Sequence, residues 1–128
     1  MSGEQWLRLG AAYHLGFALF HLGFWRLFRW NEALRPLGRV NRGIMQVLNL
    51  KLIYVFLIFA GLSWRHGPEL LASAPGQVLV AAMAGFWLLR AGEQLLFFPP
   101  RHPASIALFV VFLAGGAIHL RALMGGGD

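Results

Sequence analysis

The 128-residue sequence contains no cysteine and few charged residues. The absence of cysteine excludes a disulfide scaffold, a thiol enzyme and a cysteine-ligated metal site. Charged residues make up 12% of the chain, whereas an average soluble domain has about 25%. Only five residues are acidic. The chain also lacks the polar, aromatic-poor composition of a disordered protein, since 14% of its residues are aromatic.

Apolar residues make up 58% of the chain, and the mean hydropathy is +0.60. A soluble core of this length cannot bury so much apolar surface. The composition therefore predicts a single domain over residues 1–128 that has the lipid bilayer as its solvent. We expect an all-α integral membrane protein, a four-helix antiparallel bundle with short loops.

Four segments have about the 20 apolar residues that a membrane-spanning helix needs. The predicted spans are about 6–28, 44–64, 76–98 and 104–123. Asn41 is the expected N-cap of the second helix, and prolines begin the third and fourth helices. The basic segment 30–42 is partly apolar, which predicts a short interfacial helix between the first two spans.

The arginines predict the orientation in the membrane. The first and third loops carry Arg26, Arg29, Arg35, Arg39, Arg42 and Arg101, whereas the termini and second loop carry Arg8, Arg65 and Arg121. The positive-inside rule then places the first and third loops in the cytoplasm and both termini on the opposite side of the cell membrane. The formal net charge of +6 indicates membrane topology and anionic lipid and not nucleic acid.

Seven polar residues of the first three spans share one layer. At 1.5 Å per residue, all lie about 20–25 Å from the outer face, in the inner leaflet. Charged groups are costly at this depth and are functional candidates by default. These residues are His21, Gln46, Asn49, Lys51, Arg90, Glu93 and Gln94. Lys51 points away from Asn49, toward the headgroups or a subunit interface.

The layer predicts a site for a lipophilic small molecule such as a quinone, sterol or isoprenoid. In the catalytic form of this hypothesis, Glu93 exchanges protons and His21 is the partner acid or base. The candidate ligand-binding residues are Arg90, Gln94, Asn49, Gln46 and His14. A structural interpretation stands beside it, because Arg90–Glu93 also suits an intrahelical ion pair and the amides suit interhelical hydrogen bonds.

Two other functions fit the same residues. A proton-coupled transporter would use Glu93 and work as a homodimer, because four helices are too few to enclose a path. A haem-b electron-transfer subunit would need axial ligands on different helices, for which His14 and His119 are the candidates. An accessory subunit is the plainest alternative. No nucleotide-binding or hydrolase motif is present, and whether the protein is an enzyme stays open.

Glycines and phenylalanines occur throughout the spans. The glycines predict places where helices approach closely, and they include Gly10, Gly16, Gly85, Gly115 and Gly116. The many phenylalanines are expected to face lipid or to fill the core.

Overall fold

The computed structural model describes residues 1–125, and it confirms that the chain is all-helical. Four helices are long and three are short. The helices are α1 (Gly3–Leu22), α2 (Phe24–Leu27), α3 (Trp30–Ala33), α4 (Arg39–Arg65), α5 (Gly67–Ala72), α6 (Ala74–Phe97) and α7 (Pro103–Met124).

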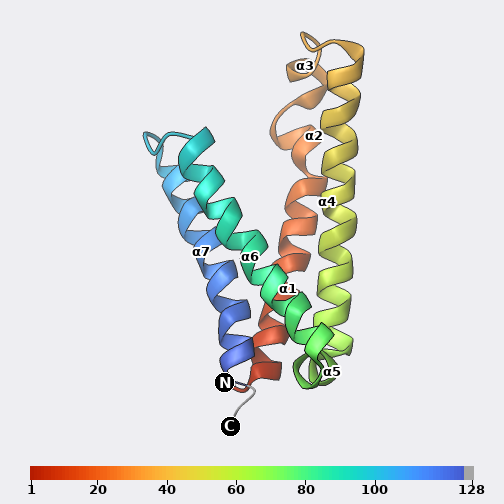
Figure 1. Ribbon diagram of the computed structural model, residues 1–128. Coiled ribbons are helices and arrows are strands. Elements are labelled where there is room, and N and C mark those ends of the chain that lie inside the picture. Colours follow the sequence, from red (N-terminus) through yellow and green to blue (C-terminus); the bar gives the residue numbers. More distant parts are fainter. Residues whose placement is uncertain (126–128) are drawn as a thin grey trace.

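The long helices form two pairs that make a V (Figure 1). One pair is α1 with α4, and the other is α6 with α7. The pairs meet through α1 and α7 and through the short α5, which connects α4 to α6. At the opposite end, where α2, α3 and the α6–α7 loop lie, the two pairs splay apart (Figure 1).

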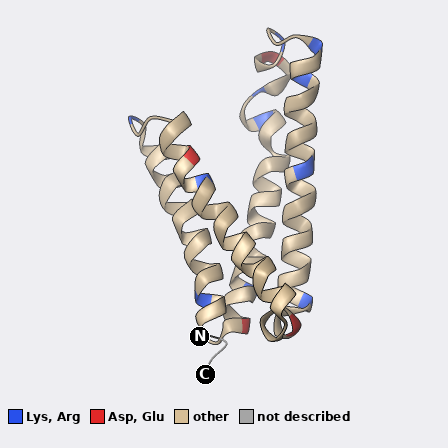
Figure 2. Cartoon of the chain, viewed as in Figure 1, with Lys and Arg blue, Asp and Glu red and all other residues tan. Residues whose placement is uncertain are grey.

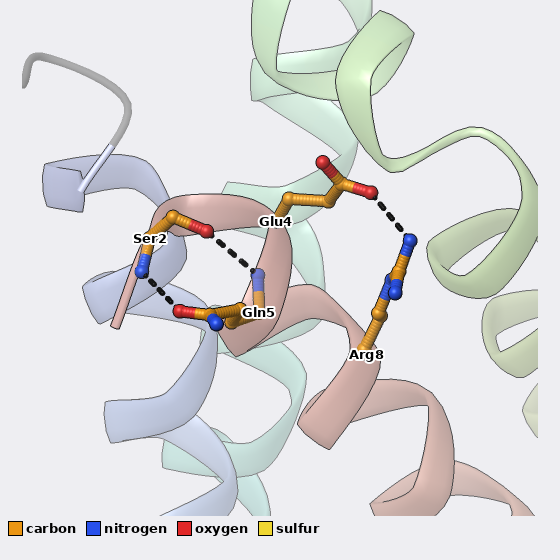
Figure 3. A network of polar contacts seen from close by, with 4 residues as sticks. All are labelled: Ser2, Glu4, Gln5 and Arg8. Atoms are coloured by element: carbon orange, nitrogen blue, oxygen red, sulfur yellow. Dashed lines mark hydrogen bonds and ion pairs between the residues drawn. The ribbon is translucent and has the colours of Figure 1, made fainter.

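Helix α1 begins at a capping box (Figure 3). The backbone N–H of Gln5 donates to the Ser2 hydroxyl at 3.2 Å, and the Ser2 N–H donates to the Gln5 side chain at 2.8 Å. One turn on, Arg8 pairs with Glu4 at 2.8 Å. The predicted start at residue 6 is therefore too late, because Ser2 and Gln5 have the spacing of a capping box.

The predicted end of the first span, at residue 28, is also wrong. Helix α1 stops at Leu22, Gly23 caps it, and the chain continues as the separate four-residue α2. Arg29 then adopts left-handed backbone angles (φ 50°, ψ 48°) before α3 begins. The single short helix expected over 30–42 is not found. Helix α3 covers only Trp30–Ala33, the chain turns over 34–37, and residues 39–42 form the start of α4.

The other spans differ less from expectation. Helix α4 begins at Arg39 after Gly38, so Asn41 lies inside the helix and is not its N-cap. Helix α6 is capped by the Ser73 hydroxyl, which accepts from the Gly76 N–H at 3.1 Å. The α5 helix was not expected, because Gly67 and Pro68 indicate a break; proline at the start of a short helix is equally favourable.

Among residues 1–125, three helices, α4, α6 and α7, are long and apolar enough to cross a membrane. Large apolar side chains are exposed along them, such as Leu50 and Leu57 of α4 and Val110 of α7. This surface suits lipid and not water, so the chain is that of a membrane-embedded protein. Helix α1 has 20 residues but is not among the three, since polar residues such as Arg8 and His21 lower its hydropathy.

Trp87 joins the two pairs at the centre of the core. Its ring stacks on Phe56 of α4, with 5.4 Å between centroids and 14° between planes, and on Phe112 of α7, with 5.9 Å and 19°. Ala18 of α1 and Ala91 of α6 complete this buried cluster. Side chains from all four long helices therefore meet at one level of the V.

Below that level, glycines let α1 and α7 approach closely. A Cβ at Gly115 would lie 2.5 Å from the Tyr13 hydroxyl, which donates to the Val111 carbonyl at 2.8 Å. A Cβ at Gly10 would lie 2.9 Å from Nε2 of His119. Each glycine thus accommodates a polar ring of the other helix.

Candidate functional site

A cavity of about 570 Å³ lies between the two pairs, above the level of Trp87. Most of its lining is aromatic. The lining side chains belong to Phe17, Phe20, His21, Phe24, Phe28, Trp30, Leu52, Phe56, Phe86, Trp87, Arg90, Gln94, Phe98, His102, Ser105, Leu108 and Phe112. Its volume is within the range of about 300–1,000 Å³ that is usual for small-molecule sites.

The α1–α3 wall is aromatic with one polar group. Phe17 and Phe20 are three residues apart on one face of α1, and Phe24 of α2 continues this wall. The ring of His21 stacks on Phe24 with 4.4 Å between centroids. Its Nδ1 is 2.8 Å from the Phe17 carbonyl and donates to it, because a carbonyl only accepts. The Nε2 of His21 is then left as an acceptor on a cavity-lining ring.

The α6–α7 wall carries a chain of hydrogen bonds. The Arg90 guanidinium donates to Oε1 of Gln94 at 3.0 Å, and Nε2 of Gln94 donates to the Ser105 hydroxyl at 2.9 Å. That hydroxyl donates in turn to the Phe98 carbonyl at 3.1 Å. The chain links α6 to α7 and fixes the orientation of the amide and the guanidinium.

The Arg90 guanidinium also lies against aromatic rings. Its Cζ is 4.5 Å from the centroid of Phe112 and 5.6 Å from that of Phe98. Within residues 1–125, the two ion pairs are Arg8–Glu4 and Arg29–Glu32, so no carboxylate lies within 4.0 Å of Arg90. Arg90 is therefore a half-buried cation held by cation–π contacts and one amide.

The structure brings only part of the predicted polar layer to the cavity. Arg90, Gln94 and His21 line the cavity, but Glu93, Asn49 and Gln46 do not. Glu93 is exposed on α6. Asn49 is buried and donates to the His21 carbonyl at 2.9 Å. Gln46 accepts from Nε1 of Trp25 at 3.0 Å. Both amides thus hold α1 or α2 against α4.

His14 and His119 lie together beneath the cavity. Both are fully buried, and their ring centroids are 4.9 Å apart. Nε2 of His14 accepts from the Trp87 indole at 3.0 Å, and Nδ1 of His119 donates to the Gly115 carbonyl at 2.7 Å. The remaining nitrogens, Nδ1 of His14 and Nε2 of His119, have no hydrogen-bond partner in the described part of the chain.

This arrangement does not fit a haem. The two rings touch, so no space remains between them for a porphyrin. Nε2 of His119 also faces α1 so closely that even a Cβ at Gly10 would lie 2.9 Å away. The pair is a packed part of the core. Between residues 1 and 125, no three side chains of the metal-binding types cluster.

No protein-family model, curated protein or solved structure matches this chain.

Two parts of the site were missed from the sequence. Ser105 follows Pro103 at the start of a helix and has no unusual neighbours in the sequence. The phenylalanines at 17, 20, 24 and 28 do repeat at helical spacing, but such a stripe is equally typical of lipid-facing and core surfaces. Only the splay of the two pairs turns it into a cavity wall.

Proposed function

We propose that this protein binds a lipophilic small molecule inside the membrane, in the cavity between the two helix pairs. The observation that carries the proposal is the aromatic lining with a few polar groups on facing walls. Small-molecule sites are typically concave and apolar with a small number of orienting polar side chains. Arg90, Gln94, Ser105 and His21 are the orienting groups, and a quinone, sterol or isoprenoid would suit the aromatic walls.

The proposal is limited to binding. Proton transfer between Glu93 and His21 would require Glu93 to reach the cavity, but its side chain is exposed and is not part of the lining. Asn49, Gln46 and His14 are supporting residues in this proposal, because they bond to neighbouring helices and not to the cavity.

We also propose that all four long helices cross the membrane, in an antiparallel bundle. Helix α1 packs along α4 and against α7, both of which are long and apolar enough to span. Its polar residue His14 is fully buried. Because α1 spans about 30 Å at 1.5 Å per residue, its length suits one crossing of the hydrocarbon core. The basic loops at the splayed end favour the cytoplasmic side.

The absence of native cysteine allows this topology to be tested with single cysteines. We expect Glu32→Cys and Arg101→Cys to react with a membrane-impermeant maleimide only after the cells are opened. Ser2→Cys and Ser73→Cys should react in intact cells. Labelling of positions 2 and 32 from the same side would show that α1 does not cross, and labelling of position 32 from outside would reverse the orientation.

Binding in the cavity can be tested with a photoreactive long-chain alcohol. We expect crosslinks, mapped by mass spectrometry, at cavity-lining residues such as Phe56. Leu52→Trp adds volume within the cavity and should reduce crosslinking there by about tenfold, in line with the 1–3 kcal/mol cost of overpacking. Leu50→Trp is the matched control, because Leu50 lies on the exposed face of the same helix.

Crosslinking that is equal in the two variants would mean that the alcohol labels the outer surface and not the cavity. The proposed function would then be wrong.

A further inference from the structure

Arg90 has more hydrogen-bond donors than the protein uses. A guanidinium has five N–H donors, and one hydrogen bond to a side chain is found, to Oε1 of Gln94. The rings of Phe98 and Phe112 contact the cation but accept none of these bonds in the usual geometry. In the described part of the chain, donor groups of this half-buried guanidinium therefore remain free at the wall of an aromatic cavity.

In the part of the chain that the structure describes, no carboxylate lies within 4.0 Å of Arg90 either; Glu93, three residues further along α6, is near enough to act on its charge but is exposed and does not line the cavity. Arg90 lies seven residues before the end of α6, which is about 10 Å below that end of the helix. A cation at this depth is costly unless it has a partner. An anionic ligand would supply both the charge and the acceptor atoms.

We infer that the ligand is a lipid with an anionic oxygen head, a carboxylate or a phosphate, on an apolar tail. This inference rests on the proposed function of the cavity. The head lies against Arg90, because a guanidinium binds carboxylate or phosphate oxygens with two parallel hydrogen bonds. The tail lies among the rings of Phe20, Phe24 and Phe56, which line the same cavity.

Two further features support an anionic head. Basic residues gather at the splayed end, most of them on the side of α2, α3 and the start of α4 (Figure 2). Such a basic surface attracts anionic headgroups from the inner leaflet. In addition, Nε2 of His21 is an acceptor on the facing wall. It suits a head that retains one hydroxyl, such as a hydrogen phosphate.

The test compares brominated stearic acid, brominated stearyl phosphate and brominated stearyl alcohol, which share one tail. Bromine quenches the fluorescence of nearby tryptophans, and Trp30 and Trp87 line the cavity. With the purified full-length protein in detergent, we expect the acid or the phosphate to bind at least about tenfold more tightly than the alcohol, as charge-assisted hydrogen bonds imply. The stronger of these two ligands identifies the head as carboxylate or phosphate.

Arg90→Gln should remove this preference, and Arg90→Lys should keep part of it because the charge remains. Arg121→Gln is the matched control, since Arg121 is exposed at the opposite end of α7. Brominated lipid that dissolves in the micelle also quenches tryptophan, but this background is the same in all of these variants. Size-exclusion profiles identify any variant that fails to fold. If Arg90→Gln fails to fold, the preference for the anionic lipids is compared between the unchanged protein and Arg90→Lys, which should keep only part of it.

The outcomes separate the two proposals. Equal binding of the acid, the phosphate and the alcohol, reduced by Leu52→Trp, would overturn the anionic head and leave the lipophilic cavity standing. Binding that no cavity variant changes would overturn both. A preference for the anionic lipids that Arg90→Gln leaves intact would assign the head to the arginines of the loops and would also overturn the inference.

Discussion

Replacement of Trp87 by alanine is expected to destabilise the protein by about 3–5 kcal/mol, the usual cost of removing a buried tryptophan. The side chain is 1% exposed and stacks on both Phe56 and Phe112. Its loss also leaves Nε2 of His14 without a donor. In a bilayer these packing contacts matter more than removal from water, because lipid tails are as apolar as the core. The measurement is an unfolding titration in mixed micelles, followed by helix content.

Two variants make that result specific. Trp64→Ala removes an indole that is 61% exposed, so its effect should be small. Trp87→Phe keeps most of the stacking and should cost about 1 kcal/mol for the hydrogen bond to His14. A Trp87→Ala protein as stable as Trp64→Ala would show that the two helix pairs are not held together by this ring.

Replacement of Gly76 by alanine is expected to have the second largest effect. A Cβ at Gly76 would overlap the carbonyl oxygen of Leu70, and it would lie 2.5 Å from the Leu70 Cα. These are backbone atoms of α5, so α5 must move away from α6 to make room. Overpacking of this kind costs about 1–3 kcal/mol and sometimes more. The same unfolding titration measures it.

Gly85→Ala is the matched control on the same helix, because a Cβ at Gly85 would contact nothing within 4 Å. Glycine in a helix interior is about 1 kcal/mol less favourable than alanine, so this variant should be unchanged or more stable. If the two variants shift the unfolding midpoint equally, the contact between α5 and the first turn of α6 does not constrain the fold.

The helical class could be predicted from composition and the long apolar segments, but the helix ends could not be predicted well. The apolar pattern continues through Gly23, so nothing in the hydropathy marks the end of α1 at Leu22. Local polar signals that the predicted spans did not use mark two of the ends. Ser2 with Gln5 at its capping-box spacing marks the start of α1, and Ser73 before Ala74 and Pro75 marks the start of α6.

For the candidate site, spacing along one helix could be predicted, but the direction in which each side chain points could not. Arg90 and Gln94 bond to each other, as their four-residue spacing predicts. Glu93 lies next to Gln94 in the same helix, yet it is exposed. The face of α6 that becomes buried depends on how α6 packs against α7, and the sequence of α6 alone does not specify that packing. The glycines divide in the same way, since Gly10 and Gly115 adjoin side chains of another helix whereas Gly16 and Gly85 do not.

Because the long helices form a V, the width of the cavity depends on the angle between the two helix pairs. The pairs meet through α1, α5 and α7 near one end, and the cavity lies toward the other (Figure 1). Each arm is about 30 Å long at 1.5 Å per residue, so a rotation of about 5° at the joint displaces the free ends by about 3 Å. Over this length, a small repacking around Trp87 would produce a wider or narrower cavity at the splayed end.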